Sequence, residues 1–166
     1  MDSAAEAAFN EFVTARSARL ARSAYLLTGD AHLAEDLVQA ALLAIARNWH
    51  RLEGDPEAYA RRVIVNQSVS WWRRRRWQES ALTPTADRAQ LSADPDAALS
   101  VARALRLLTP KQRAVLVLRY FDDLTEVQTA ATLGVSVGTV KSTTRQAFDR
   151  LRRLAPELGQ LMEEAR

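Results

Sequence analysis

The sequence predicts an all-α protein made of two small helical domains joined by a flexible linker. Three observations support this prediction. Glycine is rare, with 5 residues in 166. Apolar residues recur at the three-and-four spacing of a helix, and no run alternates apolar and polar residues as a half-buried strand would. A polar stretch at 78–93 interrupts the pattern, which separates a domain at 1–77 from a domain at 94–155 and leaves a short tail at 156–166.

The N-terminal domain is predicted to contain three helices, at about 9–28, 30–49 and 56–77. Asp30 is placed to cap the second helix, because an aspartate at that position accepts a hydrogen bond from a free backbone N–H. Asp55 and Pro56 predict the start of the third helix, with the aspartate as cap and proline at the first helical position.

The C-terminal domain is predicted to begin its first helix at 94–95 and its last helix, which ends near 154, at the cap Ser136. Thr109 and Thr125 each stand three residues before a glutamine, the pattern of a capping box. Gly134 lies between the last two helices, where a left-handed turn favours glycine. Residues 125–151 therefore have the layout of a helix-turn-helix.

The composition excludes several classes of site. There is no cysteine and there are only 2 histidines, so disulfides, thiolate zinc sites and histidine-rich metal sites are not expected. No apolar run approaches the roughly 20 residues that span a bilayer. The N-terminus has no basic and apolar export signal, so we expect a cytoplasmic protein without a cofactor or metal and without stable membrane insertion.

The charge distribution predicts two contacts with a polyanion. The net charge is +3, but residues 57–77 carry +5 and residues 101–154 carry +6, with −3 at 78–100 between them. Two basic blocks separated by an acidic stretch are typical of a chain that binds nucleic acid at two places.

The last helix presents hydrogen-bonding side chains on the face opposite to its apolar stripe. A recognition helix offers such groups, near its start, to base edges and phosphates. An ordinary helical hairpin with a solvated polar face is the alternative. The candidate residues are Thr139, Lys141, Ser142, Arg145 and Gln146.

The third helix combines a basic stripe with aromatic residues. Arginines neutralise phosphates, and tryptophan or tyrosine can stack on unpaired bases. The alternatives are a solvated helix end for the arginines and core packing for the tryptophans, which we expect for Trp71 and leave open for Trp72 and Trp77. The second helix carries Glu35, Asp36 and Gln39 on one face, which fits plain packing or a protein-docking face equally well.

Together these motifs resemble the extracytoplasmic-function sigma factors, which are promoter-recognition subunits of bacterial RNA polymerase. The amino-acid sequence of the motifs is similar to that of the SigE-like subgroup. The resemblance covers about residues 9–153. Two short pairs depart from the family pattern: the chain has Gln128-Thr129 where the family often has Glu-Ile, and Thr143-Thr144 where it usually has Arg-Leu. The matching segments are 30–42 for the polymerase-binding helix, 58–67 and 72–74 for the −10-reading helix, and 107–116 and 133–142 for the −35-reading helix-turn-helix.

The resemblance implies a transcription initiation factor with no catalytic residues. Glu35, Asp36 and Gln39 would dock on the clamp helices of the largest subunit of core RNA polymerase, and the last helix would read the −35 element of promoter DNA. The acidic linker would lie along a basic channel of the polymerase. The family also implies an anti-sigma factor and a location on the nucleoid. The residues implied at the −10 element are Arg51, Tyr59, Arg62, Asn66, Trp72, Arg73 and Arg76.

Three other functions fit parts of the sequence. Residues 108–142 also resemble the output helix-turn-helix of response regulators, but the upstream half is helical and basic and lacks the strand pattern of a receiver domain. A metal-dependent nuclease would need ligands such as Asp122, Asp123 and Glu126, or Glu35 and Asp36, and no further ligand or base is evident. The segment rich in tryptophan and arginine could bind a membrane surface as a secondary activity.

Overall fold

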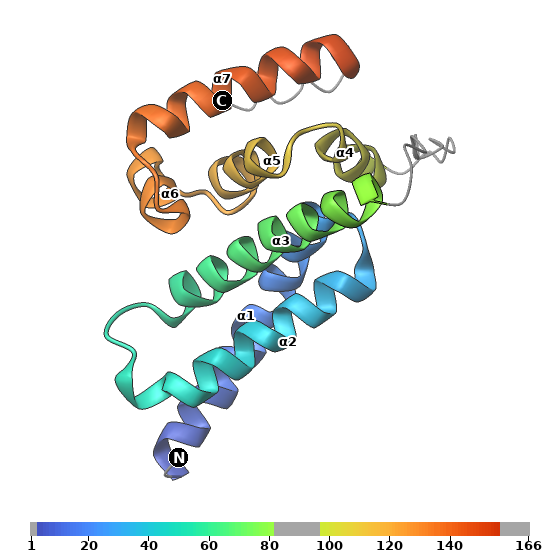
Figure 1. Ribbon diagram of the computed structural model, residues 1–166. Coiled ribbons are helices and arrows are strands. Elements are labelled where there is room, and N and C mark those ends of the chain that lie inside the picture. The colour runs from blue at the N-terminus through green and yellow to red at the C-terminus, as the bar shows by residue number, and fades with distance from the viewer. Residues whose placement is uncertain (1–2, 82–96, 157–166) are drawn as a thin grey trace.

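The computed structural model describes residues 3–81 and 97–156, and all regular structure in these ranges is helical (Figure 1), which confirms the predicted class. The N-terminal domain contains α1 (Ser3–Thr28), α2 (Ala31–Asn48), the short 3₁₀ helix η1 (Trp49–Arg51) and α3 (Pro56–Ala81). The C-terminal domain contains α4 (Ala97–Arg106), α5 (Pro110–Leu116), the π-helical turn η2 (Val117–Phe121), α6 (Glu126–Leu133) and α7 (Val137–Leu154).

Helix α3 continues through residue 81, four residues beyond the predicted end near 77. The rest of the predicted linker, 82–93, lies outside the described residues. So do the predicted helix start at 94–95 and the tail from 157 onward.

The predicted helix caps are present. The Asp30 carboxylate accepts from the backbone N–H of Leu33 at 2.9 Å. Thr109 and Thr125 each form a complete capping box with the glutamine three residues later. Gly134 adopts φ 66°, the left-handed conformation that ends α6 and turns the chain into α7. These local signals fix where the helices of the C-terminal domain begin and end.

The two domains pack against each other instead of standing apart. Figure 1 shows α3 between the α1–α2 pair and the C-terminal helices, with α7 on the outer side of the C-terminal domain. The larger of two apolar clusters in the described residues runs through both domains and includes Leu20 and Leu27 from α1 together with Leu105 and Leu118 from the C-terminal domain. Burial of this shared apolar surface favours the closed arrangement.

Arg113 of α5 is a buried link between the domains. Its side chain is 2% exposed. The guanidinium donates to the backbone carbonyls of Leu105 at 2.8 Å and of Leu27 at 2.7 Å, and it lies 4.8 Å from the centre of the Trp72 ring. Desolvation lowers the pKa of Arg113 to about 10, with a smaller contribution from the nearby Arg106 cation, so the group is still charged at neutral pH.

Candidate nucleic-acid interface

Helix α7 has the two faces that the sequence predicts. Val140, Ala147 and Leu151 are fully buried and fix the helix against the rest of the domain. Ser136 caps the helix by accepting from the N–H of Thr139 at 3.1 Å. The five candidate side chains on the outer face are all exposed: Thr139, Lys141, Ser142, Arg145 and Gln146.

The start of this helix is suited to an anion. The first backbone N–H groups of a helix are unpaired and carry partial positive charge, which attracts a phosphate. The Lys141 ammonium lies 3.6 Å from the Glu126 carboxylate of α6, and both side chains reach solvent. Because an exposed ion pair of this kind is weak, Lys141 can exchange it for a phosphate at little cost.

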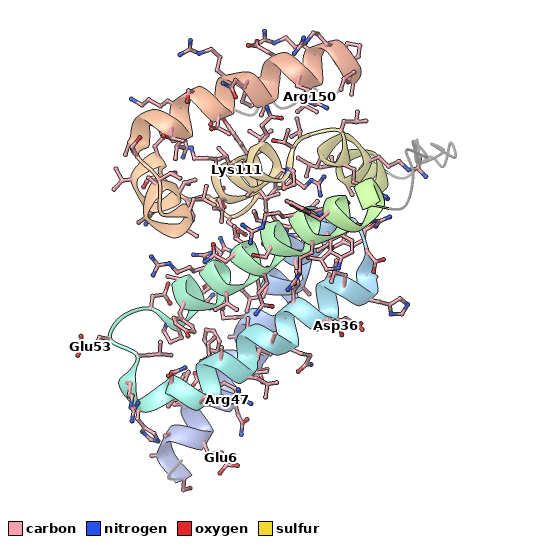
Figure 2. The ribbon with its side chains drawn as sticks, viewed as in Figure 1. Glu6, Asp36, Arg47, Glu53, Lys111 and Arg150 are labelled. Carbon is pink, nitrogen blue, oxygen red and sulfur yellow. The ribbon has the colours of Figure 1, made fainter. Side chains whose placement is uncertain are left out.

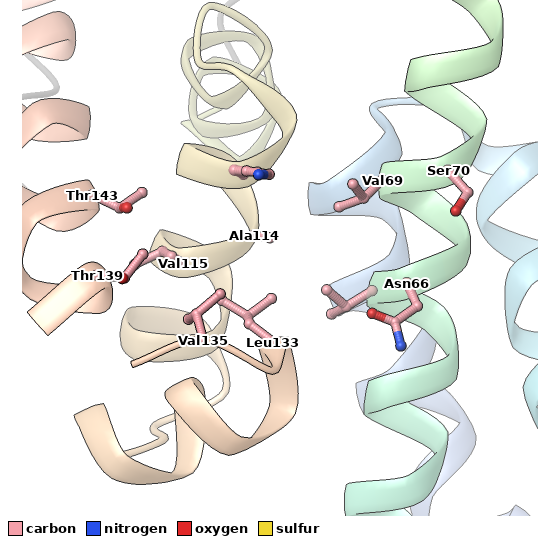
Figure 3. A pocket seen from close by; sticks show the side chains of 11 residues that line it. Asn66, Val69, Ser70, Ala114, Val115, Leu133, Val135, Thr139 and Thr143 are labelled. Atoms are coloured by element: carbon pink, nitrogen blue, oxygen red, sulfur yellow. The ribbon is translucent and has the colours of Figure 1, made fainter. Parts of the chain in front are cut away.

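The candidate face of α3 is directed toward the C-terminal domain. Arg62, Asn66 and Arg73 are exposed. Arg62 donates to the backbone carbonyl of Ala131 in α6 at 3.4 Å. Asn66 lines a cavity of about 240 Å³ between α3 and the helix-turn-helix, and the start of α7 contributes Thr139 to the opposite wall (Figure 3). The side chains proposed for two separate DNA elements therefore meet across one cavity.

The tryptophans of α3 have different environments. Trp71 and Trp72 are half-buried and meet edge to face, with ring centres 4.8 Å apart. The Trp72 indole N–H donates to the carbonyl of Leu27 at 3.4 Å. Trp77 is 77% exposed. Trp71 meets the Trp72 ring but is not among the side chains packed on the apolar core, so the core packing expected for it is not seen. Trp72 is engaged with Arg113 and α1, and Trp77 stays available for contact.

The −10 candidates Arg51 and Tyr59 do not line the cavity. Arg51 is exposed in η1, and Tyr59, in the first turn of α3, is half-buried against the core. The side chain of Arg76 lies outside the described residues. The structure thus groups Arg62 and Asn66 at the domain boundary and leaves Arg51 near the start of α3.

The face of α2 is open to solvent and larger than the sequence indicated. Glu35, Asp36 and Gln39 are exposed. Figure 2 shows Asp36 on the side of the molecule away from the C-terminal domain. Leu43, one turn beyond Gln39, is 56% exposed although it is large and apolar. Its i+4 spacing from Gln39 was the available signal, and sequence reasoning missed it because leucine at helical spacing is usually core.

The described parts of the chain contain no group of three or more His, Asp or Glu residues that could hold a metal ion. None of the helices within 3–81 and 97–156 combines the length and the apolar character that a membrane crossing requires.

Comparison with known proteins identifies both domains. The family model described as Sigma-70 region 2 matches residues 12–78, and the model described as Sigma-70, region 4 matches residues 104–153. The RNA polymerase sigma-E factor of Streptomyces coelicolor is 40% identical over 151 residues, which cover 87% of this chain and 84% of the relative. The ECF RNA polymerase sigma factor SigM of Mycobacterium tuberculosis is 32% identical over 153 residues, which cover 89% and 76%.

Solved structures agree with these relatives. The sigma factor RpoE in complex with the anti-sigma factor NepR from Bartonella quintana matches with a TM-score of 0.70 at 25% identity, over 88% of this chain and 95% of that chain. CnrH in complex with the cytosolic domain of CnrY matches with a TM-score of 0.65 at 25% identity, over 92% and 90%. With both domains matched in order and the curated relatives covered over most of their length, the chain belongs to the extracytoplasmic-function group of sigma-70 family RNA polymerase sigma factors.

Proposed function

We propose that this chain binds core RNA polymerase and directs promoter recognition and DNA melting at transcription initiation. As a sigma factor it is an initiation factor and not an enzyme. The observation that carries the proposal is the presence, in one chain, of both sigma domains, with exposed basic and amide side chains on α3 and α7 and an open acidic face on α2.

The α2 face is the proposed polymerase contact. Glu35, Asp36, Gln39 and Leu43 combine negative charge with one exposed apolar side chain. One exposed leucine is ordinary on a protein surface, so the assignment depends on the Sigma-70 region 2 match at 12–78, which contains this helix. We assign this face to the clamp helices of the largest polymerase subunit.

The α3 face is the proposed −10 contact. It reads the non-template strand through Arg62, Asn66, Trp72 and Arg73, with Tyr59 beside them. Taking a base out of the stack costs a few kcal/mol. Stacking and arginine contacts of roughly 1–3 kcal/mol per base offset that cost. Arg51 and Arg76 extend the contact at its two ends.

The α7 face is the proposed −35 contact, in the duplex major groove. Arg145 and Gln146 have the side-chain chemistry that recognises guanine and adenine edges, and Lys141 is placed for a phosphate. Specificity then depends on α7, whereas melting depends on α3.

An anti-sigma factor is a further proposed partner. The two solved structures named above are sigma factors in complexes with anti-sigma proteins, and each match extends over both domains of this chain. We place the protein in the cytoplasm, on the nucleoid, where its proposed partners are.

Size-exclusion chromatography with purified bacterial core RNA polymerase at moderate salt tests the proposal. We expect one-to-one co-elution of the intact chain. Asp36→Lys and Leu43→Asp should reduce co-elution, whereas Glu11→Lys, which alters an exposed residue of α1, should not. Failure to co-elute, combined with specific binding of the free chain to duplex DNA, would support a conventional helix-turn-helix regulator instead.

A further inference from the structure

The residue after η2 makes an unusual contact between the two domains. Asp122 is 3% exposed. The Ser23 hydroxyl of α1 donates to Oδ1 of Asp122, and Nε of Arg61 in α3 lies 3.6 Å from Oδ2. The backbone carbonyl of Asp122 accepts from Nη2 of Arg19 at 2.9 Å. A carboxylate from the C-terminal domain is therefore inserted among groups of the N-terminal domain.

The surroundings of this carboxylate are dominated by cations. Arg61 donates to Glu57 at 2.6 Å. Glu57 also lies 3.1 Å from Nε of Arg16 and 3.6 Å from Nε of Arg19. Three arginines thus share two carboxylates, one of which is Asp122. Without Asp122, the three cations would face Glu57 alone.

The side chain of Asp122 depends on the closed arrangement for its partners. The hydrogen-bond and ion-pair partners recorded for it, Ser23 and Arg61, both belong to the N-terminal domain, and Oδ2 has no hydrogen bond within the described part of the chain. If the domains separated, the carboxylate would reach water without disturbing a contact inside its own domain. Substitutions at this position therefore act on the contact between the domains and leave the apolar side chains of the shared core unchanged.

Burial raises the pKa of Asp122, and the hydrogen bond from Ser23, the Arg61 cation and the Arg19 cation oppose this effect, whereas Glu57 adds to it. A cation at the same position would meet Arg19 and Arg61 directly.

Closure has different consequences for the surfaces of the N-terminal domain. The α3 face with Arg62 and Asn66 is turned toward α6 and the cavity. The α2 face with Asp36 stays open (Figure 2). A closed chain can therefore present its α2 face to a partner while α6 and the start of α7 obstruct a nucleic-acid strand at Arg62 and Asn66.

We propose that the Asp122 contact holds the two domains of the free chain closed, so that the nucleic-acid face of α3 becomes available only after this contact has separated. What α3 then binds rests on the proposed function. The closure itself does not, because it is a property of the isolated chain.

Distance measurement by double electron–electron resonance on the full chain tests the proposal. The chain has no cysteine, so Arg47→Cys in α2 and Arg153→Cys in α7, both at exposed positions, provide two unique sites for nitroxide labels. The labelled chain is compared with its Asp122→Lys variant. Glu11→Lys is the matched control, because it makes the same change of charge at an exposed position of α1.

The labelled chain should give one narrow distance peak, and Glu11→Lys should leave it unchanged. Asp122→Lys should shift the distribution to longer and broader distances while circular dichroism retains the helix content. A broad distribution in the starting chain, or the same narrow peak in Asp122→Lys, would overturn the proposal.

A reciprocal variant keeps the test decisive if Asp122→Lys loses structure. Ser23→Asp places a second carboxylate against Asp122 from the opposite domain and should also open the chain. Combining Ser23→Asp with Asp122→Lys restores opposite charges across the contact and should recover the narrow peak. Independent effects of the two substitutions would contradict a direct contact. None of these readouts requires polymerase, so failure of the closure is distinct from failure of the proposed function.

Discussion

Replacing Arg113 by alanine should destabilise the protein more than any surface substitution on the same helix. The substitution removes two short hydrogen bonds from the charged guanidinium, one to the carbonyl of Leu105 at 2.8 Å and one to the carbonyl of Leu27 at 2.7 Å. Each carbonyl keeps a second donor, the Leu108 N–H at 3.1 Å for Leu105 and the Trp72 indole N–H at 3.4 Å for Leu27, so the cost is that of two hydrogen bonds to a charged group. At about 1.5–3 kcal/mol for each bond, the two together cost about 3–6 kcal/mol. Loss of the cation above the Trp72 ring adds to this. Against a typical total of about 5–15 kcal/mol, that is a large share of the stability.

Urea unfolding followed by far-ultraviolet circular dichroism measures this cost. Lys111→Ala is the matched control, because Lys111 lies in the same helix but is exposed, and we expect a change within about 0.5 kcal/mol. Arg113→Lys should fall between the two, since lysine keeps the charge but lacks the planar fork of donors. A loss for Arg113→Ala no greater than that for Lys111→Ala would refute the assignment of Arg113 as a structural link.

Three other predictions concern α7, the domain contact and the turn. Arg145→Ala should weaken binding of the holoenzyme to −35 duplexes and relax selectivity at one base position by about 1–3 kcal/mol. Competition among −35 variants measures this selectivity, with Arg153→Ala as the control. Unchanged selectivity would remove Arg145 from the recognition surface. Because the closed state raises the pKa of Asp122 above its ordinary 3.8, protonation favours closure. The additional stabilisation of closure by protonation is therefore complete below the ordinary pKa and is lost as the pH rises through the raised pKa, where the carboxylate contact with Ser23 and Arg61 remains. Distance measurements across a pH series should detect this loss, and Asp122→Asn should abolish it. Gly134→Ala should lower stability by about 1 kcal/mol. The cause is backbone strain at φ 66° and not a clash, because no atom lies within 4 Å of the added methyl. Gly138→Ala inside α7 should instead raise stability, and equal effects of the two variants in thermal melts would contradict this account.

The helix boundaries were predictable because their causes are local. The capping boxes at Thr109 and Thr125 and the turn at Gly134 each depend on residues three or four positions apart, and the structure has all of them. The outward face of α7 was predictable for the same reason, since helical spacing alone separates Arg145 from the buried Val140.

The packing of the domains was not predictable from these patterns. Ser23 and Asp122 are separated by 99 residues, and Arg113 is separated from Leu27 by 86. Both Arg113 and Asp122 have side chains that are normally solvated, so burial of either depends on tertiary partners that periodicity does not reveal. For the same reason the sequence could not decide whether Trp72 packs or contacts nucleic acid, because its partners Arg113 and Leu27 come from distant segments.

Transcription by a reconstituted holoenzyme on genomic DNA fragments tests the central claim most directly. Core polymerase mixed with this chain should produce transcripts that begin at a fixed distance downstream of a shared two-part sequence, and core polymerase alone should not. The same pattern of start sites with and without the chain would contradict its role as a promoter-recognition subunit.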